Sequence, residues 1–352
     1  MQDKQRENSG FIETINLSKF YSLKHGFFKQ LLGHDLDQVF AVDNVNLKLY
    51  PGEILALVGE SGSGKTTIGK LITLLEKTTK GQIKHNGLDV TNISGSNLKS
   101  YRKKVQMIFQ NPYESLDPRK TIYSSLMEPL KIQGFSNKYE IHEKVIESMK
   151  QVDLDHSKKF LNRFPHDLSG GQLQRISIAR TLVLSPSIIV ADEPVSMLDV
   201  SVRSGVMNLI LNLRDKLKIS CIFITHDLSV ARYMSDNICV MYLGSILEKG
   251  PTEQIILRAA HPYTRMLIMA VPEYQIRRKR NRVRITGEVL SVKKIPKGCR
   301  FHTRCPMVKE ICRLENPPSI EVSPERWSSC HFSAEVYEMN NSQFGKHILK
   351  FN

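Results

Sequence analysis

The chain has 352 residues, 41% of them hydrophobic and 24% charged, and its formal net charge at pH 7 is +15. This length suits one large domain with an appendage, and the composition is ordinary for a globular protein, which excludes a disordered chain. No run approaches the roughly 18–20 apolar residues that a transmembrane helix needs. Residues 1–10 are polar and lack the apolar core of a signal peptide, so we expect a loose tail on a protein that works inside the cell.

Residues 11–50 alternate apolar and polar side chains around a break at 24–38, which predicts two strands joined by a long loop. The apolar run at 54–58 is typical of a buried strand. A glycine-rich segment follows it, and apolar residues then recur at helical spacing over 68–75. This order of strand, loop and helix favours phosphate binding, because the helix N-terminus faces the anion.

The glycine-rich segment fits the P-loop pattern G-x-x-x-x-G-K-[ST]. It consists of Gly59, Glu60, Ser61, Gly62, Ser63, Gly64, Lys65, Thr66 and Thr67. The glycines allow a tight turn, Lys65 supplies a positive charge for the β- and γ-phosphates, and Thr66 supplies a hydroxyl for Mg²⁺. The segment predicts a nucleoside triphosphatase site, with a chance glycine-rich turn as the alternative.

The middle of the chain is predicted to be mostly helical. A strand is expected at 105–109, but residues 111–167 lack strand patterns, and 140–152 carries apolar residues at helical spacing. These features predict an inserted helical subdomain at 111–167. A second glycine motif follows Leu168 and opens a helix over 173–184; its residues are Ser169, Gly170, Gly171 and Gln172, with Ser169 as the N-cap.

Two further predicted strands end in side chains suited to hydrolysis. The strand at 187–191 runs into Asp192 and Glu193, which we expect to hold Mg²⁺ and to polarise the attacking water, respectively. The strand at 221–225 ends at His226, for which contact with a γ-phosphate is favoured over a purely structural role.

In this order the motifs resemble those of the ABC ATPases over roughly residues 10–260. The resemblance adds the Q-loop at 109–112, with Gln110, and the D-loop at 196–199, with Asp199. It implies that ATP lies between the P-loop of one subunit and the 168–172 signature of another, that Gln110 contacts Mg²⁺ or the attacking water, and that Asp199 reaches across the dimer. It also implies an aromatic ring stacked on adenine. Tyr21 fits this role best, with Phe20 and Phe40 as rivals and a core aromatic as the structural alternative.

The fold implied is α/β. It comprises a RecA-like parallel sheet, an N-terminal antiparallel β-subdomain and the inserted helices, all within residues 11–260. A small cysteine-rich C-terminal domain is expected at 261–335, with tails at 1–10 and 336–352. The chain has one P-loop and no internal repeat, so a second nucleotide-binding chain is expected.

The cysteines divide into two groups. Cys221 and Cys239 lie in apolar strand patterns and are expected to be core residues. Cys299, Cys305, Cys312 and Cys330 are separated by five, six and seventeen residues. Clustered thiols in an intracellular chain favour a metal over disulfides. The spacing matches neither common zinc pairs nor standard ferredoxin motifs, so it leaves the metal open.

A run of basic residues at 277–284 has three interpretations: a solvated surface, proximity to an anionic membrane, or nucleic-acid binding. No aromatic residues are interleaved with it to stack on bases. We expect no nucleic-acid partner.

The C-terminal quarter resembles that of oligopeptide and dipeptide importer ATPases, and the whole chain resembles the second ATPase subunit of a bacterial dipeptide importer. The segments that carry the likeness are 298–306, 311–312, 316–318, 330–331 and, after the Q-loop, 111–119. Leu173, Met197 and residues 288–291 depart from the family pattern without altering a catalytic carboxylate.

The resemblance implies an ATP-hydrolysing, Mg²⁺-dependent subunit at the cytoplasmic face of the inner membrane. Its partners would be a homologous ATPase, two membrane permeases and an extracytoplasmic peptide-binding protein. In this family the four cysteines can hold a [4Fe-4S] cluster. A zinc site, to which His302 or His331 could contribute, and unligated thiols are the alternatives. An importer ATPase for another solute such as nickel, and a non-transport ABC ATPase, are the alternative functions.

Overall fold

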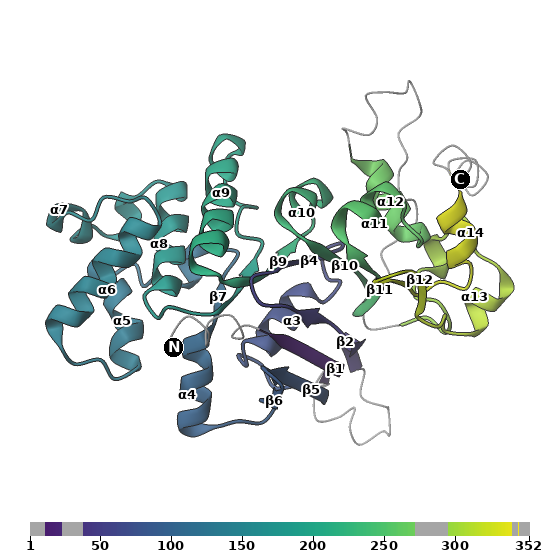
Figure 1. Cartoon of the computed structure of the whole chain (residues 1–352), viewed down its shortest axis with the longest axis horizontal. Helices are drawn as coiled ribbons and strands as arrows, with labels where there is room; N and C mark the ends of the chain where they lie inside the picture. The colour runs from purple at the N-terminus through teal and green to yellow at the C-terminus, as the bar shows by residue number, and fades with distance from the viewer. Residues whose placement is uncertain (1–10, 23–37, 272–294, 340–343, 345–352) are drawn as a thin grey trace, which may run out of the picture.

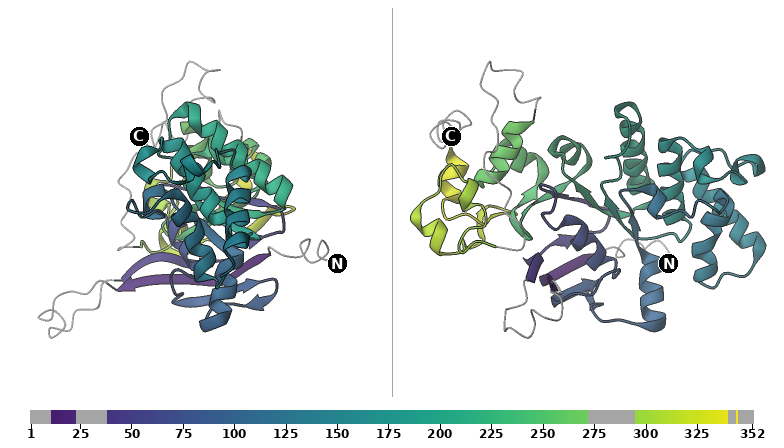
Figure 2. Two further views of the ribbon diagram at one scale, coloured as in Figure 1. Left: turned by 90° about the vertical axis from the view of Figure 1, so that its left-hand side faces the viewer. Right: turned by 180° about the vertical axis from the view of Figure 1, so that it is seen from behind.

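The computed structural model describes residues 11–22, 38–271, 295–339 and 344. The expected tail at 1–10, the basic run at 277–284 and most of the expected tail at 336–352 lie outside these residues. Helices gather at one end of the molecule, a mixed sheet occupies the centre, and the C-terminal elements lie at the other end (Figure 1). The view from behind shows the same arrangement (Figure 2, right).

The central sheet has eight strands in the order β12-β13-β11-β10-β4-β9-β8-β7. Its parallel part consists of β4 (Ile54–Val58), β7 (Val105–Ile108), β8 (Ile188–Asp192), β9 (Ser220–Thr225) and β10 (Asn237–Tyr242). Every residue of β4, β8 and β9 is buried, because elements cover both faces of a parallel sheet. Parallel strands end at the same edge, so the segments after β4, β8 and β9 meet there.

A second, antiparallel sheet carries the N-terminal strands. It is formed by β1 (Ile12–Ser22), β2 (Gln38–Val45), β3 (Lys48–Leu49), β5 (Lys80–His85) and β6 (Leu88–Asp89). This sheet and α3 (Lys65–Ile72) lie on one side of the central sheet, and α9 (Val200–Leu217) and α10 (Leu228–Met234) lie on the other (Figure 1). The two strands expected in 11–50 are β1 and β2, and a short third strand, β3, follows them.

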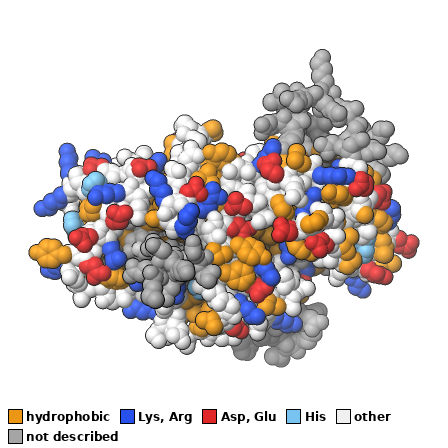
Figure 3. Space-filling model, viewed as in Figure 1, with side chains coloured by type: hydrophobic (Ala, Val, Ile, Leu, Met, Phe, Trp, Pro, Cys, Tyr) orange, Lys and Arg blue, Asp and Glu red, His pale blue; other side chains and the backbone are white. Residues whose placement is uncertain are grey.

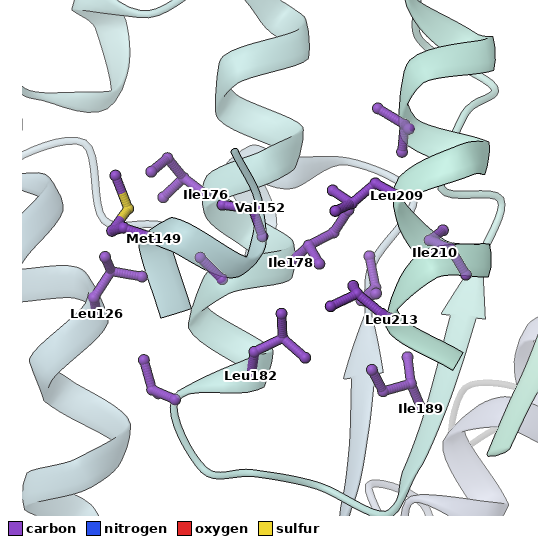
Figure 4. Close-up of a cluster of buried hydrophobic side chains, with 14 of the residues drawn as sticks. Leu126, Met149, Val152, Ile176, Ile178, Leu182, Ile189, Leu209, Ile210 and Leu213 are labelled. Carbon is purple, nitrogen blue, oxygen red and sulfur yellow. The ribbon is translucent and has the colours of Figure 1, made fainter. Parts of the chain in front are cut away.

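The helical end of the molecule follows β7. Its elements are η1 (Pro112–Glu114), α5 (Ile122–Ile132), α6 (Lys138–Gln151), α7 (Lys158–Leu161), η2 (Pro165–Asp167) and α8 (Gly170–Leu182). Thr121 and Asn137 cap α5 and α6 by accepting backbone N–H bonds. Apolar side chains of these helices, α9 and β8 pack together, among them Met149, Ile178 and Leu213 (Figure 4). One further helix, α4 (Gly95–Lys104), precedes β7.

The C-terminal elements are continuous with the central sheet. Strands β12 (Ile320–Ser323) and β13 (Arg326–Ser328) extend it through β11 (Ser245–Pro251). The remaining elements are α11 (Thr252–Leu257), α12 (Pro262–Ala270), η4 (His302–Arg304), α13 (Glu310–Leu314) and α14 (Ser333–Glu338).

The C-terminal elements also share a hydrophobic core with β4 and β10. Ala56 and Val58 belong to the same buried cluster as Tyr263, Cys299 and Phe301. The expectation of a separate cysteine-rich domain is therefore not confirmed. The reason is physical: the segment has too little apolar material for a core of its own and completes one with the ATPase sheet.

On the face seen in Figure 3, lysine and arginine side chains are interspersed with aspartate and glutamate over the described part of the surface. Within the described ranges, no helix combines the length and apolar character needed to cross a bilayer.

Candidate nucleotide-binding site

The P-loop connects β4 to α3 at the carboxyl edge of the central sheet. Gly64 precedes the first residue of α3 and has a φ of 102°, a conformation that favours glycine. A Cβ atom at this position would lie 2.2 Å from the carbonyl oxygen of Ala41 in β2. The loop therefore requires glycine for its backbone conformation and for its close contact with the neighbouring sheet.

Replacing Gly64 with alanine is expected to weaken nucleotide binding and to lower the melting temperature more than Gly62→Ala does. Both positions have positive φ, which costs alanine about 1–2 kcal/mol, but a Cβ at Gly62 meets nothing within 4 Å. Binding of a fluorescent ATP analogue and thermal unfolding of the two variants measure the difference. Equal effects would show that the contact with Ala41 is unimportant.

Lys65 is the buried cation of this loop. Its Nζ donates to the carbonyl oxygens of Gly59 and Glu60, at 2.8 and 2.9 Å, and lies 3.3 Å from Ser63 Oγ. Burial lowers the pKa of Lys65, and nearby carboxylates act in the opposite direction. The ammonium group is thus held at the loop by acceptors that a phosphate can replace.

The predicted Mg²⁺ residues meet across the end of β8. Thr66 Oγ1 donates to Asp192 Oδ1 at 3.1 Å. Burial raises the pKa of Asp192, and the bond from Thr66 opposes that rise. A hydroxyl and a carboxylate beside a phosphate loop are ligands that suit Mg²⁺, which prefers few protein oxygens together with phosphate.

Glu193 lies between the other two predicted catalytic residues. Gln110 Nε2 donates to one carboxylate oxygen at 3.0 Å, and His226 Nδ1 lies 3.1 Å from the other. Glu193 has a φ of 44°, which is uncommon for a residue other than glycine, and its N–H donates to the carbonyl of Ile224 at 3.0 Å. The fold thus holds the carboxylate in a strained backbone position, a pattern that clusters at functional sites.

Apart from Asp192, which is not in its lining, these site residues border one open cavity of about 630 Å³. Its lining contains P-loop residues together with Gln110, Glu193 and His226, as well as Ala41 and Leu267. The sequence analysis missed Ala41 and Leu267, because nothing in the local pattern of β2 or α12 indicates that these residues reach the P-loop.

The candidates for the adenine contact lie at the end of β1 and near the start of β2, where Phe20 is paired with Phe40. Burial raises the pKa of the Tyr21 hydroxyl, and the nearby carboxylate of Glu76 acts in the same direction. The ring centroids of Phe20 and Phe40 lie 4.6 Å apart, with the rings packed edge to face. Tyr21 is not among the residues that line the P-loop cavity, and its stacking on adenine stays a prediction.

The signature motif lies away from this cavity. Ser169 is the N-cap of α8, as predicted, and forms a reciprocal capping box with Gln172. None of residues 169–172 lines the cavity, and neither does Asp199, which is exposed at the start of α9. Leu173, which departs from the family pattern, is fully buried.

The four C-terminal cysteines converge on a second cavity of about 10 Å³, where all four thiols are buried. The N–H of Phe332 donates to Cys330 Sγ at 3.4 Å. Burial raises the pKa of Cys299 to about 11 and that of Cys330 to about 12.

The histidines proposed for a zinc site, His302 and His331, also line this cavity. A ring nitrogen of His302 lies 2.8 Å from the carbonyl oxygen of Cys299, and one of His331 lies 3.0 Å from that of Glu315. Among the residues that the structure describes, no group of three or more His, Cys, Asp or Glu side chains is arranged to hold a metal ion. The iron–sulfur and zinc interpretations therefore gain no support from a preformed metal geometry.

Comparisons with known proteins agree with this architecture. The model of the ABC transporter family matches residues 42–196, and that of the oligopeptide/dipeptide transporter C-terminal region matches 247–312. The dimeric ATP-binding cassette MJ0796, in a post-hydrolysis state bound to ADP and Pi, is 29% identical with a TM-score of 0.59, over 68% of this chain and 98% of that one. CbiO1 of Clostridium perfringens, with a TM-score of 0.60 at 21% identity over 76% of this chain and 96% of that one, shares the fold.

Relatives with assigned names cover almost the whole chain. The dipeptide transport ATP-binding protein DppF of Haemophilus influenzae is 46% identical, over 91% of this chain and 96% of that protein. The oligopeptide transport ATP-binding protein AppF of Bacillus subtilis is 43% identical over the same shares. This chain therefore belongs to the family of ABC ATP-binding proteins of dipeptide and oligopeptide transport, which confirms the resemblance inferred from its motifs.

Proposed function

We propose that this chain is an ATP-hydrolysing subunit of an importer for dipeptides or oligopeptides. The observation that carries the proposal is the single cavity in which Lys65, Gln110, Glu193 and His226 meet. Bound ATP would place its phosphates on the P-loop N–H groups and Lys65. Thr66 and Asp192 would hold Mg²⁺, and the ion would neutralise negative charge on the β- and γ-phosphates.

Hydrolysis follows from the position of Glu193. A water molecule held by this carboxylate and Gln110 attacks the γ-phosphorus, and the bond to the β,γ-bridging oxygen breaks. Glu193 accepts the proton of the water, and His226 contacts the γ-phosphate oxygens. The products are ADP and inorganic phosphate.

A second ATPase chain would complete the site. Asp199 faces solvent, and the nearby hydrophobic residues Met197 and Val200 are 63% and 80% exposed. Exposed apolar side chains that lie close together favour a protein interface. We propose that the 168–172 signature of this chain closes on the nucleotide of its partner, and that the partner's signature closes on the cavity described above.

The isolated chain is accordingly expected to hydrolyse ATP slowly. Turnover per chain should rise when the homologous ATPase is added, or with concentration if the chain pairs with itself. Phosphate release measured over a range of concentrations tests this. Full turnover that is independent of concentration, in a chain shown to be monomeric, would contradict the shared site.

Peptides as the transported solute are supported by the names of the relatives, which are transport proteins for dipeptides and oligopeptides. The partners would be two permeases and a peptide-binding protein, with this chain at the cytoplasmic face of the membrane. Cells that carry Glu193→Gln should lose uptake of a labelled dipeptide but retain uptake of labelled nickel. If the variant lost nickel uptake and kept dipeptide uptake, nickel would be favoured as the transported solute.

We also propose that Cys299, Cys305, Cys312 and Cys330 ligate one [4Fe-4S] cluster with a structural role. The support is the donor set: four buried thiols of one cavity, one of which already accepts a backbone N–H bond. The cluster would supply binding free energy that stabilises the C-terminal segment.

Anaerobically purified protein should be brown and contain about four iron and four sulfide ions per chain. Cys305→Ser should lose the colour and the iron, whereas Cys239→Ser, in the core strand β10, should retain both. Colourless protein with one zinc per chain would favour the zinc alternative, and protein without metal would favour unligated thiols.

A further inference from the structure

Two arginines, Arg300 and Arg304, lie between Cys299 and Cys305 in the cysteine segment (residues 299–330), and Arg304 contacts a residue of the nucleotide site. Arg304 is only 4% exposed. Its guanidinium donates to both carboxylate oxygens of Glu60, at 2.7 and 3.0 Å, and to Tyr242 Oη at 3.3 Å. This bidentate ion pair joins positions 244 residues apart in the sequence. Such forked pairs fix geometry as well as adding energy.

Glu60 is the second residue of the P-loop, and each of its polar groups has a different partner. Its carboxylate binds Arg304, its N–H donates to Tyr263 Oη at 3.1 Å, and its carbonyl accepts from Lys65 Nζ at 2.9 Å. The contacts therefore run without a gap from the cysteine segment to the lysine that faces the phosphates.

Arg300 makes a second connection on the other side of the loop. It donates to the carbonyl of Leu243 and pairs with the carboxylate of Asp43. The next residue, Gly244, donates its N–H to the carbonyl of Ser63 in the P-loop at 2.9 Å. Both arginines of the cysteine segment are thus directly bonded to groups that hold the P-loop.

We propose that Arg304 is a positioning residue for the P-loop: through Glu60 it couples ATP affinity to the folded state of the cysteine segment. The inference deepens the proposed function and rests on ATP binding at this site. Loss of the pair leaves the Glu60 carboxylate without its partner, so the loop relaxes from the conformation that binds phosphate. Because coupling between sites is reciprocal, bound ATP should also stabilise the cysteine segment.

The first measurement is the affinity of the full chain for MgATP, in the Glu193→Gln background to prevent turnover. Arg304→Ala should weaken binding by about tenfold or more, within the range of energetic coupling between sites. Arg304→Lys should recover part of the loss, because it keeps the charge without the fork. Arg258→Ala, which removes a C-terminal ion pair with Glu338 instead, should leave affinity unchanged.

Glu60→Gln distinguishes positioning from a general loss of stability. It should weaken MgATP binding to a similar extent, and the double variant with Arg304→Ala should be no weaker than either single variant. Additive effects, or unchanged affinity in folded Arg304→Ala, would overturn the inference. If Arg304→Ala fails to fold, Arg304→Lys and Glu60→Gln decide the question.

The second measurement does not use catalysis. Hydrogen exchange of the backbone N–H groups of residues 299–305, measured by mass spectrometry, should slow when MgATP binds to the parent chain. The slowing should be smaller in Arg304→Lys and in Glu60→Gln. Equal protection in all variants would overturn the inference while leaving the proposed function intact. Failure of the parent chain to bind MgATP at all would overturn both.

Discussion

Glu193→Gln is expected to lower ATP turnover of the assembled transporter by about 10²–10⁴-fold while leaving ATP binding intact. The amide keeps the shape of the side chain and can still contact Gln110 and His226, but it cannot accept the proton of the attacking water. The carboxylate in the native chain lies 3.0 Å from Gln110 Nε2 and 3.1 Å from His226 Nδ1, so the site already orients it.

The matched control is Glu143→Gln on the exposed face of α6, which should not alter turnover. Phosphate release and nucleotide binding are measured on the same preparations. Turnover of the Glu193 variant close to that of the parent would show that another group accepts the proton.

Lys65→Ala is expected to weaken ATP binding itself, on the order of 10²-fold or more. The variant removes a buried cation whose loss leaves the phosphates without a charged donor, and truncating one partner of a buried charge pair costs about 2–5 kcal/mol. The backbone acceptors that hold Nζ, at Gly59 and Glu60, would also lose their donor.

Lys77→Ala is the control, because Lys77 is exposed beyond the end of α3. Calorimetry with MgATP separates the two variants. If Lys65→Ala kept its ATP affinity and lost only turnover, Lys65 would act on the transition state instead of on binding.

The parallel sheet and the catalytic edge could be predicted from the sequence because their signals are local. The apolar runs that became β4, β8 and β9 are each followed directly by their functional residues, and parallel strands bring those ends together. The same local logic identified Ser169 as a helix cap.

The contacts made by the C-terminal segment could not be predicted in this way. The pairing of β13 with β11 and the ion pair between Arg304 and Glu60 join residues far apart in the chain, and no periodicity marks them. Convergence of the four cysteines was expected from their clustering, but spacing does not specify what thiols bind. The transported solute is selected mainly by other chains, so this sequence contains little information about it.

The central claim is that ATP hydrolysis at this site drives peptide import. The most direct measurement is uptake of a labelled dipeptide into proteoliposomes that contain the permeases, both ATPase chains and the peptide-binding protein, with phosphate release recorded at the same time. We expect peptide-loaded binding protein to stimulate ATP hydrolysis and uptake together, and Glu193→Gln in this chain to abolish the stimulated uptake. Peptide uptake that continues at the parent rate in the variant, or ATP hydrolysis that does not respond to the peptide, would contradict the claim.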